Sequence, residues 1–395
     1  MIKKLSTEPY KGVRDFYPKD QAVQNYIFNV WKKVCERFGY EEYGASILEP
    51  TELYSSKTSD EIVSEQTYTF IDRGKRSVTL RPEMTPSVAR LVAGRKRELS
   101  FPLRWYSIPN CFRYERPQRG RVREFWQLNA DIFGVPGIEA EVEIIALAHA
   151  LMKEFGAKNE DFEIRINDRG LVKESLMTRM SELEAEEELR KIDKGISKES
   201  GSDTLRPESS ISKVIEELSK RGVQNIRYDR TLVHGFQYYT GTVFEVYDTN
   251  DKNPRSIFGG GRYNSLTEMF GEGSVPAVGF GKGDVIIRDF LETHGLMPNL
   301  RSSTSVFICP LSYEYRDSAN KLADFLRSQN ISCAVYYGDK KIGDQVKIAN
   351  KKNIPCIIAV GKEELISGRY TLKKLSTGEE FSGTEDFIAS RLISS

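Results

Sequence analysis

The sequence predicts an α+β fold, in which an antiparallel sheet is flanked by helices and is followed by a separate α/β domain. Segments with alternating apolar and polar residues dominate the middle of the chain, and short turns or long insertions join them without regular β-α-β alternation. Residues 293–304, rich in Gly, Pro and Ser, have the composition of a linker. Beyond them, apolar strands alternate with amphipathic helices. We therefore expect a first domain at 1–298 and a second at 303–395.

The first domain is expected to begin with an amphipathic helix over residues 20–38. Its apolar residues recur at helical spacing, and Asp20 is a candidate N-cap. Residues 171–222 are rich in Glu, Lys and Ser and predict a small, partly exposed helical insertion. Strands are predicted where the alternation has a period of two. These segments are 77–81, 103–108, 123–133, 162–166, 241–247 and 257–258.

The second domain shows β-α-β-α-β alternation, which indicates at least some parallel strands. Its segments are, in order, SVFICPL, DSANKLADFLRSQ, CAVYYG, IGDQVKIANKK and PCIIAVG. Residues 301–395 contain 14 Lys and Arg against 11 Asp and Glu, and five of the lysines lie within 339–352. A mildly basic helix suits contact with a polyanion, although a solvated helix face has the same composition.

The charge balance excludes a uniformly basic nucleic-acid coat, because 58 Lys and Arg meet 57 Asp and Glu. Any polyanion site must therefore come from local clustering. No apolar run reaches the ~18 residues that a membrane span needs. The N-terminal lysines are not followed by an apolar segment, so they do not form a secretory signal. We expect a cytoplasmic protein without a membrane contact.

Cysteine and histidine usage argues against a metal centre built from protein ligands alone. The five cysteines are scattered and none is paired as CxxC, so reduced thiols are expected. Three histidines leave little room for a multi-histidine centre. Any metal should be a hard cation held by oxygens and phosphates.

The densest chemical signal lies between residues 104 and 131. Six Arg and no Lys occur from 104 to 123, and Pro117 and Gly120 suit a turn between two strands. Alternation places Arg113 and Glu115 on one face of the first strand. It places on one face of the second strand Phe125, Gln127, Asn129 and Asp131. Arginine suits bidentate phosphate binding, so we favour a ligand site over an exposed hairpin whose charges serve solubility.

Three other segments carry weaker signals. Glu83 and Thr85 follow an apolar strand, where a carboxylate could bind an ammonium group. Three consecutive glycines at 259–261 allow close approach to a ligand but also occur in plain turns, and Arg262 beside them offers a cation. The glycine-rich run at 275–287 suits a strand-to-helix turn. None of these segments matches a P-loop or a dinucleotide fingerprint.

Taken together, the motifs resemble those of class II aminoacyl-tRNA synthetases, and specifically the histidyl-tRNA synthetase family, over almost the whole chain. The matching segments are PYKGVRDFYP, LEPTELY, FRYERPQRGRVREFWQLNADIFG, LVHGFQYYTGTVFEV and FGGGRY. The segment GDKKIGDQVKIANKKNIPCIIAVG resembles the family's anticodon-binding domain. The resemblance implies a six-stranded antiparallel sheet with helices, a C-terminal α/β domain and a homodimer.

The resemblance also implies histidine–tRNA ligase activity, in which histidine and ATP, aided by Mg²⁺, form histidyl-adenylate and the histidyl group passes to the 3′ end of tRNA(His). Arg113 and His234 would act in catalysis. ATP would be bound by Arg113, Glu115, Arg121, Phe125 and Arg262. Histidine would be bound by Glu83, Thr85, Gln127, Asp131, Tyr238 and Tyr239, with Asp131 and Tyr239 on the imidazole nitrogens. The tRNA acceptor end would meet Arg116, Gln118 and Arg119.

Three positions depart from the family pattern. His234 and Gln237 stand where arginine and aspartate are usual, and Ile286 stands where an ATP-binding arginine is expected. These changes either weaken activation, with Arg262 compensating in part, or mark a rebuilt site. If His234 is a weakened arginine with an ordinary pKa near ~6.5, activation should improve as the pH falls toward 6.

A protein that has lost catalysis and serves as a regulator or binder is the alternative reading of the same motifs. Regulatory proteins with this catalytic fold generally lack the anticodon-binding domain and have eroded ATP motifs. Here the C-terminal domain is present, and Arg113, Glu115, Arg121 and Phe125 are intact. The sequence therefore favours the ligase.

Overall fold

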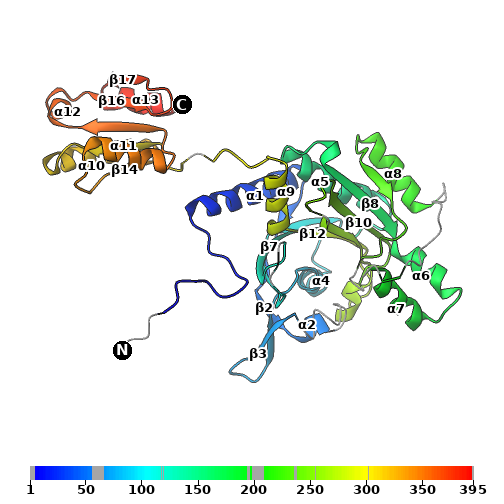
Figure 1. Ribbon diagram of the computed structural model, residues 1–395. Helices are drawn as coiled ribbons and strands as arrows, with labels where there is room; N and C mark the ends of the chain where they lie inside the picture. Colours follow the sequence, from blue (N-terminus) through cyan, green and yellow to red (C-terminus); the bar gives the residue numbers. More distant parts are fainter. Residues whose placement is uncertain are drawn as a thin grey trace. The chain divides into compact units, whose positions relative to one another are not determined.

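The computed structural model describes residues 5–55, 66–116, 118, 120–193, 196–197, 209–234, 238–253, 255–300 and 302–393. The chain divides into two compact units, Met1–Pro298 and Asn299–Ser395 (Figure 1). Among the described residues, no helix combines the length and apolar character needed to cross a membrane.

A nine-stranded sheet forms the centre of the first unit. Its main row runs in the order β1 (Glu41–Glu42), β5 (Leu103–Ser107), β7 (Glu124–Phe133), β12 (Ala277–Gly283), β11 (Ser256–Arg262), β10 (Thr242–Asp248), β8 (Phe162–Asp168) and β9 (Ile226–Tyr228). The ninth strand, β6 (Asn110–Phe112), pairs with β7. The six strands from β5 to β8 are antiparallel, whereas β1 and β9 join the two edges in parallel. The predicted six-stranded antiparallel sheet is therefore confirmed, with one parallel strand added at each edge.

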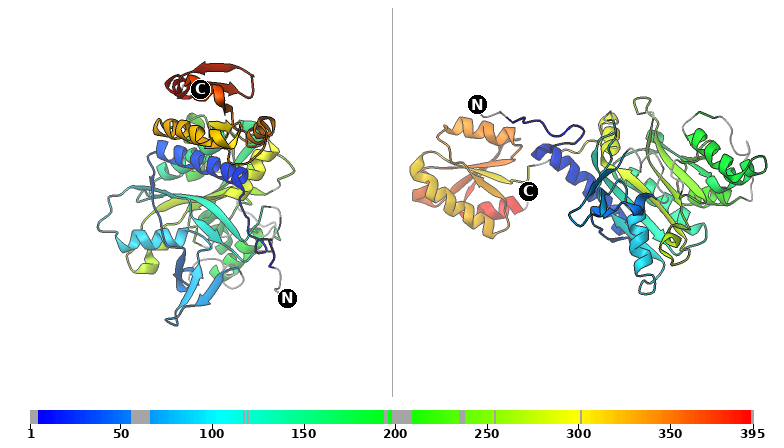
Figure 2. Two further views of the ribbon diagram at one scale, coloured as in Figure 1. Left: turned by 90° about the vertical axis from the view of Figure 1, so that its left-hand side faces the viewer. Right: turned by 90° about the horizontal axis from the view of Figure 1, so that it is seen from below.

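Helices cover both faces of this sheet. On one face, α1 (Pro18–Arg37) contacts α5 (Glu139–Glu154) and α9 (Asp284–Thr293), and both α5 and α9 contact β7 and β12. On the other face, α4 (Thr85–Gly94) packs with β5, β7 and β10 around a buried cluster. A smaller sheet orders β2 (Leu48–Pro50), β4 (Ser77–Leu80) and β3 (Tyr68–Ile71), and its β3–β4 hairpin projects from the unit (Figures 1 and 2).

The start of α1 differs from the prediction. The helix begins at Pro18, which occupies the first turn, where a missing N–H costs nothing. Asp20 therefore lies inside the helix and does not cap it. Its carboxylate pairs with Arg288 of α9 at 3.1 Å. The apolar stripe of the helix is buried as its spacing predicts, at Val23, Ile27, Val30 and Val34.

The predicted insertion at 171–222 divides into two parts with different surroundings. α6 (Arg169–Met177) and α7 (Glu182–Asp193) pack on each other through Val172, Leu176 and Leu189. α8 (Ser210–Lys220), capped by Ser209, packs instead on α5 and β8. The insertion therefore ends before α8, which belongs to the main body. Residues 198–208, between α7 and α8, lie outside the described residues.

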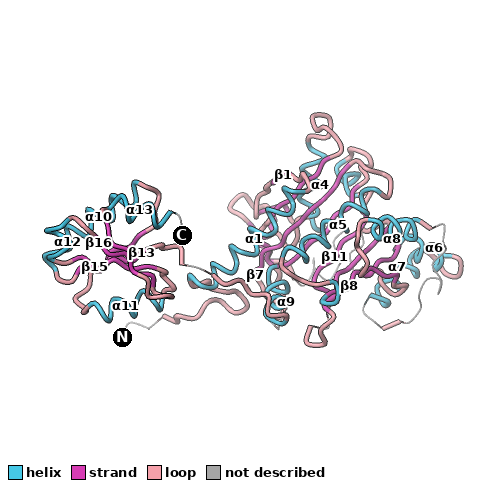
Figure 3. The backbone as a smooth tube through the Cα atoms, turned by 90° about the horizontal axis from the view of Figure 1, so that it is seen from above, coloured by secondary structure: helices cyan, strands magenta, loops and turns pink. Residues whose placement is uncertain are grey.

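The second unit is an α/β domain with a mixed five-stranded sheet. Its order is β14 (Cys333–Val335), β13 (Val306–Pro310), β15 (Cys356–Val360), β16 (Tyr370–Lys374) and β17 (Glu380–Gly383). The first three strands are parallel and the rest antiparallel, as the β-α-β-α-β alternation predicts for its first part. Helices flank the sheet (Figure 3). These are α10 (Arg316–Ser328), α11 (Ile342–Lys351), α12 (Lys362–Ser367) and α13 (Glu385–Ile393). α10 and α13 share one core cluster, and α11 packs on the other face.

Candidate active site

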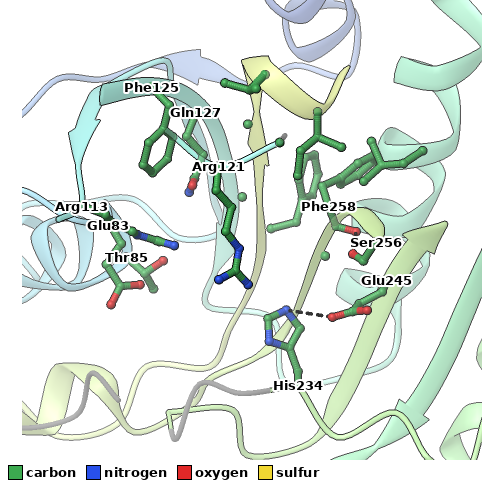
Figure 4. A pocket seen from close by; sticks show the side chains of 18 of the residues that line it. Glu83, Thr85, Arg113, Arg121, Phe125, Gln127, His234, Glu245, Ser256 and Phe258 are labelled. Atoms are coloured by element: carbon green, nitrogen blue, oxygen red, sulfur yellow. Dashed lines mark hydrogen bonds and ion pairs between the residues drawn. The ribbon is translucent and has the colours of Figure 1, made fainter. Parts of the chain in front are cut away.

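Most of the predicted site residues meet in one pocket on the α4 face of the main sheet (Figure 4). The hairpin contributes two sides of it, because β6 and β7 lie next to each other. The predicted residues that line it are Glu83, Thr85, Arg113, Glu115, Arg121, Phe125, Gln127, His234, Tyr238 and Tyr239. The sequence alone did not single out Glu245, Ser256 and Tyr263, which also line it.

The hairpin brings two guanidinium groups and a carboxylate together. The Nε of Arg113 donates to the carbonyl of Pro82 at 2.9 Å, and its guanidinium lies 5.3 Å from the ring centre of Phe125. Glu115 lies 4.0 Å from Arg113 and 3.4 Å from Arg121. The backbone contact and the ring hold Arg113 in place while its terminal nitrogens face the pocket. Such a fixed cation suits an anionic ligand.

Two glycines of β12 leave room for two side chains of β7. Gly279 pairs with Asp131, and Gly281 pairs with Asn129. A Cβ on Gly279 would collide with the Asp131 carboxylate, and one on Gly281 would lie within 2.9 Å of the Gln127 carboxamide carbon. The side chains of Asp131 and Gln127 can therefore lie along the sheet face only because the neighbouring positions of β12 are glycines, which have no side chain.

Asp131 lies beneath the pocket and is 1% exposed. The Tyr263 hydroxyl donates to its Oδ1, while its Oδ2 has no hydrogen-bond partner among the described residues. Burial raises the pKa of Asp131 to about 7, against the opposing effect of the Tyr263 hydrogen bond. Asp131 therefore retains one buried acceptor oxygen, which the predicted contact with an imidazole nitrogen would need. The hydroxyl that bonds to it in this structure belongs to Tyr263.

At the acidic end of the pocket, a second tyrosine donates a hydrogen bond to a buried carboxylate. Glu83 follows β4 and is 2% exposed, and the Tyr238 hydroxyl donates to its Oε2 at 3.1 Å. Thr85 begins α4 beside it. A buried carboxylate with one such hydrogen bond retains acceptor capacity for an ammonium group.

His234 enters the pocket in an unusual backbone conformation. Its φ is 54°, in the left-handed region that residues with a Cβ rarely adopt. The Nε2 lies 3.8 Å from Oε1 of Glu245, and the ring centre lies 4.8 Å from that of Tyr239. Burial lowers the pKa of His234 to about 4. The imidazole is therefore neutral at pH 6 and above, and the expectation that it protonates near pH 6 is wrong.

Arg262 does not reach the pocket. Its guanidinium forms a buried ion pair with Glu141 of α5 at 2.5 Å and also donates to the carbonyls of Val135 and Gly137. These contacts engage the guanidinium of Arg262 and stabilise the packing of β11 against α5. The structure thus gives Arg262 a structural place and does not support the expected contact with ATP.

The glycine triplet beside Arg262 is the middle of β11 and not a turn. Ile286 lines the pocket with an apolar side chain. The two basic residues near it in the sequence are unavailable, because Lys282 is fully buried and Arg288 pairs with Asp20 and Glu292. Arg255, which is exposed, instead borders a hollow shared with Ile286 and Ser256.

The hairpin tip is exposed at Arg116 and Gln118, as a contact with an external partner requires. Gln118 forms a two-residue bridge with Arg121, so the tip lies next to the pocket. Arg119 and Gln237 lie outside the described residues.

Comparison with known proteins assigns the family. The model of the family described as "Histidyl-tRNA synthetase" matches residues 12–197 and 175–282, which together cover more than half of the chain. The chain belongs to the histidyl-tRNA synthetase family. A model described as "Anticodon binding domain" matches residues 305–394, within the second unit.

Relatives with full-length matches agree with this assignment. The histidine–tRNA ligase of Leptospira biflexa is 39% identical, and the match covers 96% of this chain and 95% of that protein. The histidine–tRNA ligase of Thermoplasma volcanium is 34% identical, with 95% and 96% covered. The crystal structure of apo Staphylococcus aureus histidyl-tRNA synthetase has a TM-score of 0.77 and 26% identity, covering 98% of this chain and 100% of that one.

The histidyl-tRNA synthetase fold also occurs in a structure whose description includes a regulatory role. That Bacillus halodurans protein is described as an ATP phosphoribosyltransferase regulatory subunit/histidyl-tRNA synthetase, with a TM-score of 0.72 and 23% identity. At this identity the likeness shows the fold alone. The relatives named histidine–tRNA ligase match this chain at higher sequence identity, so the comparisons do not favour the regulatory alternative.

Proposed function

We propose that the chain is a histidine–tRNA ligase, which activates histidine with ATP and transfers it to the 3′ end of tRNA(His). The observation that carries this proposal is that one pocket contains both groups suited to bind a nucleotide and groups suited to bind an amino acid. The hairpin supplies guanidiniums and an aromatic ring for a nucleotide, and the buried acids supply acceptors for an amino acid. The relatives named histidine–tRNA ligase support the same activity.

In the activation step, the histidine carboxylate attacks the α-phosphorus of ATP and pyrophosphate leaves. Negative charge gathers on the phosphate oxygens as the new bond forms. Arg113 is already fixed by Pro82 and Phe125, so it can stabilise this charge without reorganising. Phe125 offers its ring for stacking on adenine, and Arg121 adds a second cation beside Glu115.

Histidine would be held at both ends. Glu83 and Thr85 would accept hydrogen bonds from the ammonium group, and Gln127 would contact the carboxylate end. Asp131 would accept from one imidazole nitrogen, and Tyr239 would bond to the other. This pairing selects a side chain with two opposed polar edges, because a side chain without a donor there leaves the Oδ2 of Asp131 buried with no hydrogen-bond partner among the described residues.

Mg²⁺ would be bound together with the nucleotide. The described residues contain no group of three or more His, Cys, Asp or Glu placed to hold a metal. Mg²⁺ usually retains water and binds through substrate phosphates with one or two carboxylates. Glu115 is the pocket carboxylate that we assign to this role, because its Oε2 is buried and accepts no hydrogen bond among the described residues, although it lies 3.4 Å from Arg121. The ion would supply positive charge for the leaving pyrophosphate.

The second unit would bind the anticodon, and the hairpin tip at Arg116, Gln118 and Arg119 would meet the acceptor end. The anticodon-binding family model supports the first assignment. A homodimer remains part of the proposal on the basis of the family resemblance.

Histidine-dependent exchange between ATP and pyrophosphate tests the proposal without tRNA. We expect exchange with histidine and only background exchange with phenylalanine or glutamine. Absence of exchange in correctly folded protein would favour the regulatory alternative.

A chain of residues 1–298 should still form histidyl-adenylate but charge tRNA poorly. The first unit contains every described pocket residue, whereas α11 and its domain supply the separate grip on the anticodon. Pyrophosphate exchange and aminoacylation, measured on the same preparation, check this. Equal aminoacylation by the short and full-length chains would show that the second unit has another role.

Arg255→Ala should raise the KM for ATP about threefold to tenfold and leave kcat unchanged. Arg255 is exposed in a hollow that shares Arg121, Ser256 and Ile286 with the pocket, so its contact with a phosphate would be screened by solvent and worth ~1 kcal/mol. Steady-state exchange kinetics measure both constants. Arg221→Ala, which removes an exposed charge next to α8, is the matched control. An unchanged KM would remove Arg255 from the nucleotide site.

His234→Arg should accelerate adenylate formation by a factor that does not depend on pH between 6 and 8.5. An arginine in this place carries a full charge and a fork of donors, worth ~2–4 kcal/mol more than a neutral donor. Since burial lowers the pKa of His234 to about 4, neither side chain titrates in this range. Pre-steady-state rates with Mg²⁺ as the sole divalent cation measure the ratio. A wild-type rate that gains on the variant toward pH 6 would show that the imidazole protonates there.

A further inference from the structure

The hairpin that carries Arg113 and Glu115 extends beyond its last pair of strand residues. Arg113 and Phe125 lie on the same side of the pocket (Figure 4). β6 ends at Phe112, which pairs with Glu124 of β7. Arg113 and Glu115 follow this pair, so the β6–β7 ladder does not fix their backbone. A further feature must hold this part of the chain if the guanidinium is to be in place before a ligand binds.

Arg123 contacts the backbone of both residues. Its carbonyl accepts a hydrogen bond from the Arg113 N–H at 3.0 Å, and its Nε donates to the Glu115 carbonyl at 3.1 Å. Arg123 is 8% exposed and is not among the described residues that line the pocket. Its influence on the pocket therefore passes through the hairpin backbone and not through contact with a ligand.

The chain segment before α1 holds Arg123 in turn. The Arg123 N–H donates to the Gly12 carbonyl at 2.6 Å. Its Nη1 donates to the Lys11 carbonyl and to the Tyr10 hydroxyl, each at 3.3 Å. The guanidinium also lies 3.9 Å from the ring centre of Tyr114 and 5.8 Å from that of Tyr10. We call this set of contacts the N-terminal brace.

The guanidinium of Arg123 serves backbone contacts and not an ion pair. Among the described residues, no carboxylate forms an ion pair with it, although it is largely buried. Burying a cation costs free energy unless carbonyls and aromatic rings replace its water. An apolar side chain would avoid this cost, but it would leave the carbonyls of Glu115 and Lys11 without their donor. The need for an arginine here therefore lies in the attachment of the hairpin to the N-terminal segment.

We propose that Arg123 is a positioning residue for the activation step, which sets the backbone of Arg113 and Glu115 and is itself held by residues 10–12. A displacement of ~1 Å at a reacting centre can cost ~10²-fold in rate. The N-terminal segment thereby contributes to activation without touching a substrate. The effect on activation rests on the proposed function, whereas the effect on the hairpin does not.

Arg123→Met removes every side-chain donor and keeps a side chain that can fill the space. We expect adenylate formation in a single turnover, at saturating ATP and histidine, to fall ~10–100-fold. The KM for ATP should change less than this rate. Arg123→Lys keeps a charge near the Tyr114 ring but lacks the planar fork that reaches both carbonyls, so its rate should lie between those of the wild type and Arg123→Met.

Arg104→Met is the matched control. It removes another partly buried arginine of the same segment, which pairs with Glu143 at 2.6 Å and has no printed contact with the hairpin backbone. Its adenylation rate should equal that of the wild type. A loss of rate in Arg104→Met as large as that in Arg123→Met would show that any weakening of the first unit slows activation, and would overturn the positioning role.

A double-mutant cycle with Arg113→Ala tests whether Arg123 acts through Arg113. Once the Arg113 guanidinium is absent, Arg123→Met should lower the rate much less than it does in the wild-type background. Hydrogen exchange of the amides at 112–116, measured without substrates, gives a readout that does not depend on activity. We expect these amides to exchange ~10-fold faster in Arg123→Met and at the wild-type rate in Arg104→Met.

Two results would overturn the inference. One is a pair of rate effects that multiply fully in the double mutant, and the other is unchanged hydrogen exchange at 112–116 in Arg123→Met. If the wild type shows no histidine-dependent exchange between ATP and pyrophosphate while hydrogen exchange at 112–116 depends on Arg123, the ligase function is wrong and the N-terminal brace stands.

Discussion

Arg113→Ala should lower the rate of histidyl-adenylate formation by ~10²–10³-fold and leave the fold intact. Arg113 is held by the Pro82 carbonyl at 2.9 Å and by the Phe125 ring, so its charge is in place before the reaction begins. Removal of one preorganised group that stabilises transition-state charge typically costs this much. Single-turnover measurement of adenylate, at saturating ATP and histidine, reports the chemical step.

Arg95→Ala is the control for this experiment, because it removes the same charge from a side chain that is 77% exposed. Its rate should equal that of the wild type. An Arg113→Ala effect confined to the KM for ATP would mean that the guanidinium binds substrate and transition state equally.

Lys282→Met should stabilise the first unit by ~1–4 kcal/mol at pH 7. Lys282 is 0% exposed, and the described residues provide no salt bridge to its ammonium group. Its Nζ lies 4.5 Å and 4.9 Å from the ring centres of Phe258 and Phe155, and 3.4 Å from the sulfur of Met152. A methionine side chain has a similar length and suits these apolar neighbours.

The gain should shrink as the pH rises. Burial lowers the pKa of Lys282 well below its usual value, whereas in the unfolded chain it is ~10.4. Between these two values the unfolded chain binds more protons, so the wild-type protein becomes more stable with increasing pH, while the variant lacks this contribution. The difference in unfolding free energy should therefore be largest below the folded pKa and fall toward pH 10.

Urea unfolding followed by tryptophan fluorescence measures this difference. All three tryptophans, Trp31, Trp105 and Trp126, lie in the first unit, so the signal is specific to it. Lys19→Met, the same change at an exposed position of α1, should be nearly neutral. A destabilised Lys282→Met protein, or a difference that does not change with pH, would contradict the account of a buried lysine that has no salt bridge among the described residues.

The sequence predicts the parts of this protein that depend on local periodicity. The alternation in β7 places Phe125 and Gln127 on one face, and the same pattern before the turn places Arg113 and Glu115 toward them. Arg113 and Glu115 lie just beyond the end of β6 and not on a strand as predicted, but β6 pairs with β7, so the hairpin still brings these side chains together without distant partners. The α/β pattern of the second unit is local in the same sense.

Only the tertiary structure decided how far each group is buried and which partner it has. Arg262 is committed to Glu141, 121 positions away in the sequence, and Tyr263 bonds to Asp131 from another strand. The pKa of His234 is below the ordinary value that we expected, because the surrounding segments bury its ring away from water. Burial and pairing arise from contacts between residues that are distant in the sequence, and no local pattern of apolar and polar residues contains them.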